Sequence, residues 1–287
     1  MGTKDITEKH LEELNDVFAD IVNVLLFDGE QLVKENELET DTTKTMFKAN
    51  GEIHEQERDV SKIWKNGEIR LSILGLENQT VQDADMPLRV ISYDGASYKQ
   101  QYLDKGNKKR YPVVTLVLYF GTNDVWSTKQ SLYECFENVP EKLMPYVNNY
   151  KINVFNIAWL SDEQISMFKS DFKCIAEFLR TQRINEEYYG SKEKLLHANE
   201  TLKLFTALMG DDSFEMVYNE NNESEGGSNM CNVVEQIINK GRQEQAIEAA
   251  IKTIQKYNAT PEEAANDMGA PLDKVLERLK ELENQKQ

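Results

Sequence analysis

Two carboxylates and one amide in the first third of the chain are the side chains best suited to chemistry. Glu77 and Gln79 close an apolar run that begins at Ile73, and Asp59 stands at the start of another strand-like segment. Residues two apart in a strand project from the same face, so Glu77 and Gln79 would point together. A second carboxylate beside them would make an oxygen-rich pocket for a hard divalent cation. We expect Mg²⁺ there, held by Asp59 and Glu77, with Mn²⁺ as the alternative ion.

Such a pocket is the minimal apparatus for metal-dependent phosphodiester hydrolysis. A bound ion would lower the pKa of a water molecule and stabilise charge that develops on the phosphate. Gln79 does not titrate near neutral pH, but its amide can orient water and bond to phosphate. We therefore predict Asp59, Glu77 and Gln79 as catalytic residues. The alternative is that Glu77 and Gln79 are ordinary residues at a strand end and that Asp59 pairs with Arg58 or Lys62.

The composition is that of a chain able to bury a sizeable core. Its 287 residues suggest one large domain or two smaller ones. The longest apolar run, residues 113–120, is too short to span a membrane and fits a buried strand. The N-terminus has no apolar signal core, and the three cysteines lie far apart without a metal-binding spacing. We therefore expect a cytoplasmic protein with reduced thiols and no membrane segment.

The charge distribution decides which segment could meet a nucleic acid. The formal net charge of -17 argues against nonspecific nucleic-acid binding by the whole chain. Residues 98–113 nevertheless carry five basic side chains against one acidic side chain. We expect Lys108, Lys109 and Arg110 in this segment to contact a phosphate backbone next to the acidic pocket. The charge is equally compatible with a solvated, lysine-rich loop.

The hydrophobic pattern predicts an α/β protein built around a mixed sheet. An amphipathic helix over residues 7–27 should end at Asp28-Gly29, and a polar, irregular or partly extended connection should follow over 30–57. Strands are predicted at 58–64, 68–77, 112–120 and 152–160. Further helices are predicted from 85 past 98, from 161 to 180 and from 192 to 208.

The first two strands should form a hairpin, because Asn66-Gly67 between them is a strong turn signal. With a two-residue turn, simple alternation puts Asp59 and Glu77 on opposite faces of the sheet, where they could not share an ion. One extra residue in the second strand would restore a common face, and glycine often marks such a bulge. We therefore predict a bulge or sharp bend within residues 72–76, with Gly75 as its favoured position.

The C-terminal part should be helical and separate. Residues 219–229 are polar and contain glycine, which predicts a linker. Beyond it, residues 230–287 show a long helix to 257, a capping box that starts at Thr260, and two short helices separated by Gly269. The two short helices resemble a helix-turn-helix, yet residues 232–287 hold 10 acidic and 8 basic side chains. We therefore favour an element for homo-oligomerisation or partner binding over a DNA reader.

The motif residues resemble one known family. Asp59, Glu77-Asn78-Gln79 and the run from Asp85 to Tyr93 look like the recombination-promoting nuclease/putative transposase family of the PD-(D/E)XK nuclease superfamily. That family has Glu-x-Gln in place of Glu-x-Lys, followed closely by Met-Pro-x-Arg-x-x-x-Tyr. The segment Asp16-Val17-Phe18-Ala19-Asp20 is similar to the family's N-terminal helix, which borders the active site, although many relatives carry a lysine in place of Ala19.

The resemblance implies a fold, an activity and further site residues. The fold would be a restriction-endonuclease-like PD-(D/E)XK core over residues 1–218, a mixed central sheet flanked by helices, with an α-helical C-terminal extension. The activity would be that of a Mg²⁺-dependent DNA endonuclease linked to recombination or mobile elements. Asp20 would support the site or simply be solvated, and Arg89 would bind phosphate or hold a catalytic carboxylate in place. The alternative function is a catalytically inactive family member that regulates or assembles through its C-terminal helices.

Overall fold

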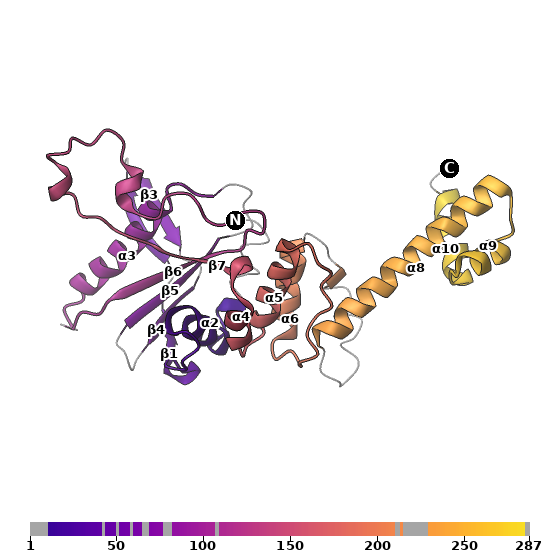
Figure 1. Cartoon of the computed structure of the whole chain (residues 1–287), viewed down its shortest axis with the longest axis horizontal. Helices are drawn as coiled ribbons and strands as arrows, with labels where there is room; N and C mark the ends of the chain where they lie inside the picture. The colour runs from indigo at the N-terminus through magenta and orange to yellow at the C-terminus, as the bar shows by residue number, and fades with distance from the viewer. Residues whose placement is uncertain are drawn as a thin grey trace. The chain divides into compact units, whose positions relative to one another are not determined.

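The computed structural model divides the chain into two compact units. Unit 1 comprises residues 1–188 and 195–212, and unit 2 comprises residues 189–194 and 213–287. The residues whose structure is described are 11–41, 44–49, 52–57, 60–64, 69–76, 82–106, 109–209, 213–214 and 229–284. Figure 1 shows both units and labels their larger elements.

Unit 1 combines strands and helices. Its strands are β1 (Leu38–Thr40), β2 (Lys44–Ala49), β3 (Glu52–Glu57), β4 (Val60–Trp64), β5 (Ile69–Leu76), β6 (Val113–Tyr119) and β7 (Asn153–Asn156). Its α-helices are α2 (Asn15–Phe27), α3 (Met86–Leu103), α4 (Asp162–Met167), α5 (Phe172–Arg183) and α6 (Ala198–Met209). Its short 3-10 helices are η1 (Glu35–Glu37), η2 (Leu132–Cys135), η3 (Met144–Tyr146) and η4 (Ile157–Trp159).

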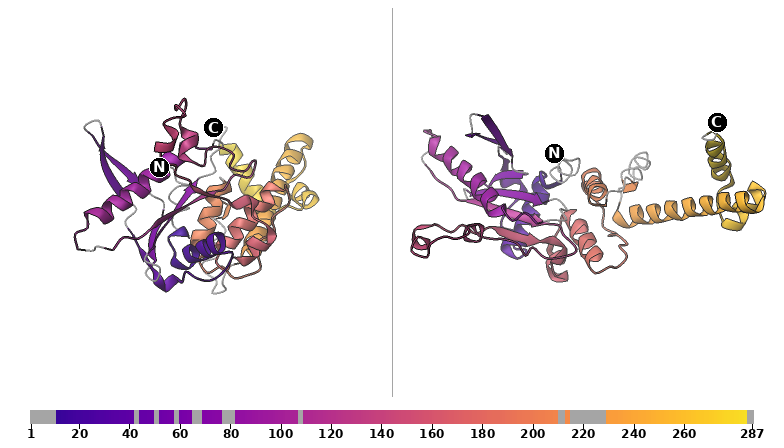
Figure 2. Two further views of the ribbon diagram at one scale, coloured as in Figure 1. Left: turned by 60° about the vertical axis from the view of Figure 1, so that its left-hand side comes forward. Right: turned by 90° about the horizontal axis from the view of Figure 1, so that it is seen from above.

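Five of the strands form one mixed sheet in the order β1-β4-β5-β6-β7. β1, β4 and β5 are antiparallel neighbours, whereas β6 and β7 continue parallel to β5. The chain passes from β5 to β6 through α3, because parallel neighbours need a crossover rather than a tight turn. β2 and β3 form a separate antiparallel pair (Figure 2). The predicted mixed sheet with flanking helices is therefore confirmed.

Different segments cover the two faces of the five-stranded sheet. On one face Thr115 of β6 donates a hydrogen bond of 2.7 Å to Asp94 of α3. Ser61 of β4 points to this same face, because its hydroxyl lies 3.2 Å from that of Ser72, the residue paired with Thr115. The next residue, Lys62, points the other way and donates to the carbonyl oxygen of Glu13, just before α2, at 2.8 Å. α3 and the N-terminal segment thus lie on opposite faces (Figure 1).

Apolar side chains fill both layers. Beneath α3, a buried cluster comprises Met86, Val90, Tyr93, Val117, Tyr119, Trp126 and Ile152. Phe120 follows β6, and the centre of its ring lies 6.5 Å from that of Phe172 in α5. α2 contributes its apolar stripe, of which Val17, Phe18 and Ile21 are fully buried. The sheet is therefore packed against apolar side chains on both of its faces.

Four predicted elements differ from the observed ones. The strand expected over 152–160 ends at Asn156, and η4 follows. The single helix expected over 161–180 is divided into α4 and α5. The connection expected over 30–57 contains β1 and the β2–β3 pair, and the helix expected from 192 begins only at Ala198.

Unit 2 contains three helices in its described part, α8 (Met230–Tyr257), α9 (Pro261–Met268) and α10 (Leu272–Asn284). The capping box predicted at Thr260 is confirmed, since Thr260 accepts from the backbone of Glu263 and the Glu263 carboxylate accepts in return. Gly269 ends α9 in the left-handed region, as its position predicted. The core of this unit comprises Ala250, Ile251, Ala264, Ala265 and Val275. None of the helices in the described ranges is both long and apolar enough to cross a membrane.

Candidate functional site

The three predicted catalytic residues lie outside the described residues, but the strand ends next to them are described. Val60 begins β4 one position after Asp59, and Leu76 ends β5 one position before Glu77. Because β4 and β5 are antiparallel neighbours, these two ends meet at one edge of the sheet. Val60 pairs with Ile73, three residues or roughly 10 Å along β5 from its last residue. The fold therefore brings to the same edge the two described strand ends that adjoin the predicted residues.

β5 is regular up to its last residue. It pairs with β6 without interruption from Arg70 to Leu76, and Gly75 lies opposite Leu118. An extra residue in β5 would shift this ladder by one position, so the bulge predicted at Gly75 is wrong for the β5–β6 pair. With regular strands, Asp59 and Glu77 can share an ion only if the backbone departs from alternation next to these residues, outside the described ranges.

The basic segment lies at the opposite edge of the sheet. Lys109 and Arg110 are exposed and precede Val113, the first residue of β6, whereas Lys108 is outside the described residues. Since β5 and β6 are parallel, Val113 lies where β5 begins, roughly 20 Å along the strands from Leu76. The expectation of a basic loop next to the acidic pocket is therefore not met by the described basic side chains.

Gln82 ties the chain beyond Gln79 to the loop that follows β6. Its amide nitrogen donates to Oδ2 of Asp124 at 3.2 Å and to the carbonyl oxygen of Val125 at 2.8 Å. Its amide oxygen accepts from the backbone N–H groups of residues 127 and 128 at 2.7 and 3.0 Å. One side chain thus uses both ends of its amide to clamp two segments more than 40 residues apart.

The loop held by Gln82 is anchored a second time by Tyr119 at the end of β6. The Tyr119 hydroxyl donates to Oδ1 of Asp124 at 2.8 Å. Burial raises the pKa of this hydroxyl, and its hydrogen bond to Asp124 raises it further, so the phenol stays protonated and remains the donor. Sequence reasoning missed Gln82 and Asp124. The available signal was the polar turn directly after a strongly apolar strand, where sites of α/β proteins often lie.

Arg89 has a partner close in sequence. Its guanidinium lies 2.9 Å from the carboxylate of Asp83, and the arginine side chain is 44 % exposed. Asp83 precedes α3, so this ion pair joins the first turn of the helix to the segment that leads into it. The structure thus supplies a partner for Arg89 other than the two predicted ones, phosphate or a catalytic carboxylate.

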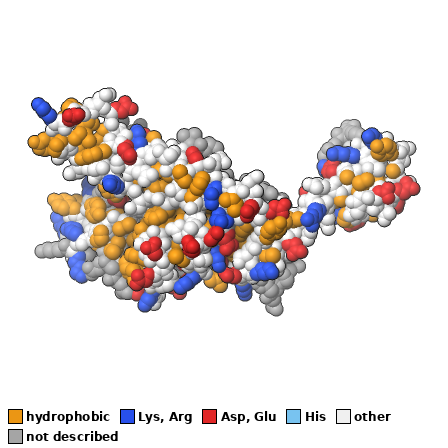
Figure 3. All heavy atoms as spheres, viewed as in Figure 1, with side chains coloured by type: hydrophobic (Ala, Val, Ile, Leu, Met, Phe, Trp, Pro, Cys, Tyr) orange, Lys and Arg blue, Asp and Glu red, His pale blue; other side chains and the backbone are white. Residues whose placement is uncertain are grey.

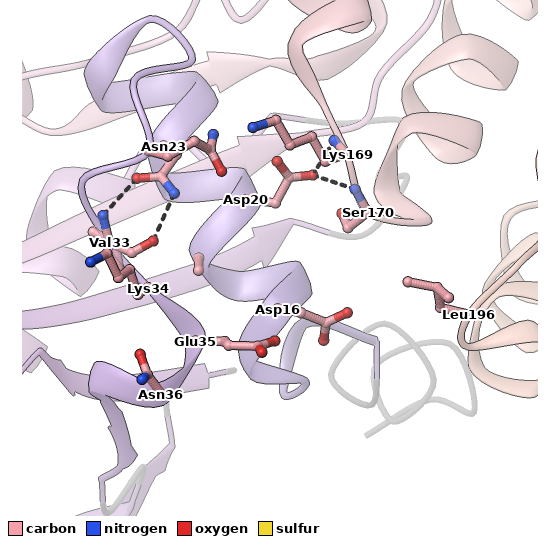
Figure 4. Close-up of a pocket in the computed structure, with 12 residues that line it drawn as sticks. Asp16, Asp20, Asn23, Val33, Lys34, Glu35, Asn36, Lys169, Ser170 and Leu196 are labelled. Carbon is pink, nitrogen blue, oxygen red and sulfur yellow. Dashed lines mark hydrogen bonds between the residues drawn. The ribbon is translucent and has the colours of Figure 1, made fainter.

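Asp20 is buried beside a cavity of about 490 Å³ on the surface of α2 (Figure 4). Only 5 % of Asp20 is exposed, so the alternative of a solvated residue is wrong. Its Oδ2 accepts hydrogen bonds from the backbone N–H groups of Lys169 and Ser170 at 2.8 and 2.7 Å. These bonds fix the bend between α4 and α5, which explains why the predicted single helix is divided.

Two neighbours of Asp20 are also used to hold segments together. The amide of Asn23 donates to the carbonyl of Val33 at 2.8 Å and accepts from its N–H at 2.9 Å, as Figure 4 shows. Asp16, one helical turn earlier, lies 2.7 Å from Nε2 of His197, which precedes α6. Polar side chains of α2 therefore bond to the loop at Val33, to the bend before α5 and to His197 at the start of α6.

The described part of the chain contains no group of three histidine, cysteine or carboxylate side chains that could hold a metal ion. The predicted ligands Asp59 and Glu77 stand outside that part. Their donor atoms are carboxylate oxygens with an amide close by in sequence, and these are ligands that Mg²⁺ accepts. The donor set therefore fits the ion by its chemistry.

The described residues of unit 1 define a mixed α/β protein whose candidate site lies at strand ends. Residues 61–206 match the family model described as "Putative transposase, YhgA-like", which covers just over half of the chain. The chain belongs to this family, which is part of the PD-(D/E)XK nuclease-like group. The family links the chain to mobile elements and to DNA. No curated protein and no solved structure matches the chain.

Proposed function

We propose that this protein is a Mg²⁺-dependent DNA endonuclease that acts in recombination or in the movement of mobile elements. The observation that supports this most is the pairing of β4 with β5, which brings the chain next to Asp59 and Glu77 to one edge of the sheet. Membership in the PD-(D/E)XK nuclease-like group supports the same reaction class. In this proposal the five-stranded sheet and its helices are the restriction-endonuclease-like core.

The residues of the proposed site divide the work between them. Asp59 and Glu77 would hold the ion, which when bound supplies a more acidic water and stabilises negative charge on the phosphate. Gln79 would orient the attacking water and bond to a phosphate oxygen through its amide. Gln82 would keep the chain after Gln79 in place through its four hydrogen bonds to the loop after β6.

Lys109 and Arg110 serve affinity rather than chemistry in this proposal. They lie at the other edge of the sheet, roughly 20 Å from the end of β5. That spacing corresponds to about six base pairs of duplex at 3.4 Å each, so they would neutralise phosphates away from the scissile bond. Their replacement should weaken DNA binding in a salt-dependent manner and leave the rate at saturating DNA unchanged.

Cleavage of plasmid DNA by the purified protein, with Mg²⁺ or Mn²⁺ added, tests the proposal. Asp59→Asn and Glu77→Gln should each lower the rate by roughly a thousandfold. Glu30→Gln is the matched control, because it removes an exposed carboxylate of unit 1 and should leave the rate unchanged. Cleavage that survives in Asp59→Asn would overturn the assigned site.

A catalytically inactive family member is the second candidate, and the regular β5 strand through Gly75 favours it. Without a change of alternation next to Asp59 or Glu77, the two carboxylates would face opposite sides of the sheet. Mn²⁺ binding, followed by electron paramagnetic resonance, separates the two candidates. Binding by the unmodified protein that is lost in both carboxylate variants supports the nuclease, and no binding in any of them supports the inactive member.

A further inference from the structure

Residues 128–149 form an arm of unit 1 between β6 and β7 (Figures 1 and 2). Its two ends are held together like a short antiparallel ladder. The N–H of Ile152 donates to the carbonyl of Gln130 at 3.0 Å, and the N–H of Leu132 donates to that of Tyr150 at 2.8 Å. Ser131 and Lys151 form the bridge between these two bonds. The two chain segments at the base of the arm, residues 130–132 and 150–152, are therefore hydrogen-bonded to each other.

Hydrogen bonds inside the arm hold its shape. The Tyr133 hydroxyl donates to the carbonyl of Val147 at 2.6 Å, and the Tyr133 N–H donates to the side chain of Asn149 at 3.0 Å. The Glu134 carboxylate accepts from the backbone N–H groups of Gln130 and Ser131, both at 2.7 Å. These bonds, first that from Gln130, lower the pKa of Glu134. The arm has the fixed conformation that reduces the entropic cost of binding a partner.

The tip of this fixed arm presents apolar side chains to solvent. Phe136, Leu143 and Tyr146 are 39, 53 and 84 % exposed. Figure 3 shows hydrophobic side chains gathered on the arm, with charged side chains among them. Exposed apolar side chains gathered on an ordered scaffold mark an interaction surface, and aromatic residues are enriched at the centres of such surfaces.

The charges of the arm select the class of partner. Between residues 128 and 149 the acids are Glu134, Glu137 and Glu141, and the bases are Lys129 and Lys142. A segment with an acidic excess gains nothing from the phosphate backbone, so DNA is disfavoured. A protein partner fits an apolar centre with a charged rim.

We propose that the arm tip, defined by Phe136, Leu143 and Tyr146, is the interface with a second copy of this chain. A two-fold interface pairs one surface with itself and therefore needs charges of both signs on the same rim. The tip meets this condition, because the exposed side chains of Glu141 and Lys142 are neighbours of its apolar residues. Neither of them has an ion-pair partner within the described ranges. In the dimer, Lys142 of each copy faces the acidic rim of the other. This proposal is independent of the proposed nuclease activity.

Sedimentation equilibrium of the full chain over a series of concentrations tests this interface. A monomer–dimer equilibrium is expected, and Tyr146→Ser and Leu143→Ser should each raise its dissociation constant by about tenfold or more. Tyr102→Ser is the matched control, since Tyr102 lies in α3 and is 76 % exposed. It should leave the constant unchanged. All three side chains are exposed, so the thermal midpoints of the variants should equal that of the unmodified chain when all are measured below the dissociation constant, where every chain is monomeric.

Charge exchange and a variant in unit 2 complete the test. Lys142→Glu should weaken the dimer, and adding Glu141→Lys in the same chain should restore it. Leu276→Ser, in α10, reports on assembly through the C-terminal helices, where Leu276 is 38 % exposed. A chain that is monomeric at every concentration overturns the proposal. So does a dimer that tolerates Tyr146→Ser, or one that is lost only in Leu276→Ser.

Discussion

The carboxylate of Asp20 accepts a hydrogen bond of 2.7 Å from the backbone N–H of Ser170, a residue 150 positions further along the chain. A second bond, from Lys169, ends on the same oxygen. Together they replace the helical hydrogen bonds that these two N–H groups would make if α4 and α5 were one helix. The family resemblance placed Asp20 at the border of an active site. The contacts that Asp20 makes in the structure are those of a residue that anchors the bend between α4 and α5.

Asp20→Ala should lower the free energy of unfolding by about 2–3 kcal/mol, because two N–H groups lose a charged acceptor in a buried place. Asp20→Asn keeps an acceptor oxygen and should cost less. Urea unfolding measures both changes. Glu30→Ala, an exposed carboxylate close to the end of the same helix, is the control and should stay within about 0.5 kcal/mol. Equal losses for Asp20→Ala and Glu30→Ala would contradict the anchoring role.

Two aspartate–arginine pairs of unit 1 should differ sharply in their effect on stability. Asp41 pairs with Arg70, with side chains 8 and 4 % exposed, whereas Asp83 pairs with Arg89 at a half-exposed site. Asp41→Ala leaves a buried guanidinium without its ion-pair partner and should cost about 3–5 kcal/mol. Asp83→Ala should cost about 1 kcal/mol or less, because water screens that pair. Thermal or urea unfolding of the two variants gives the comparison, and similar losses would refute it.

Glu134→Gln should loosen the base of the arm at neutral pH but not in acid. The pKa of Glu134 lies below its usual 4.5 because backbone N–H groups bond to the charged form. A lowered folded-state pKa means that the stabilisation is complete above the unfolded value and is lost as pH falls through the folded value. Amide hydrogen exchange at Gln130 and Ser131 measures this. The unmodified chain should be better protected than the variant at pH 7, and the two should converge only once the pH has fallen below the lowered pKa of Glu134. A difference that persists unchanged in acid would exclude the carboxylate as its cause.

If the proposed nuclease activity holds, replacements at Gln79 should show whether the reaction needs a hydrogen-bonding side chain at this position and whether it tolerates a positive charge there. Gln79→Lys creates the Glu-x-Lys pattern of the wider superfamily and should keep DNA cleavage, since an ammonium can also contact water and phosphate. Gln79→Ala should lower the cleavage rate by roughly a hundredfold. Glu30→Gln is the control, because Glu30 is exposed and has no part in the proposed site. Full activity in Gln79→Ala would remove Gln79 from the mechanism while leaving Asp59 and Glu77 to be tested separately.

The sequence by itself determined the features that depend on a few neighbouring residues. The end of α2 at Asp28, the capping box at Thr260 and the stop at Gly269 follow from backbone preferences within one helical turn. The hairpin register, with Val60 opposite Ile73, follows from the two-residue turn signal and the apolar runs on either side. The family motif could also be recognised from the sequence, because the residue types and their spacing between Asp59 and Tyr93 carry it.

Only the tertiary structure decided the features that join distant segments. The division of α4 from α5 depends on Asp20, and the clamp by Gln82 depends on a loop more than 40 residues away. The regular ladder at Gly75 is set by its pairing with β6, which overrides the local tendency of glycine to form a bulge. The parallel crossover also carried Lys109 to the far edge of the sheet from Leu76. Such outcomes arise because long-range contacts contribute more free energy than the local preferences they oppose, and a linear sequence does not display which contacts form.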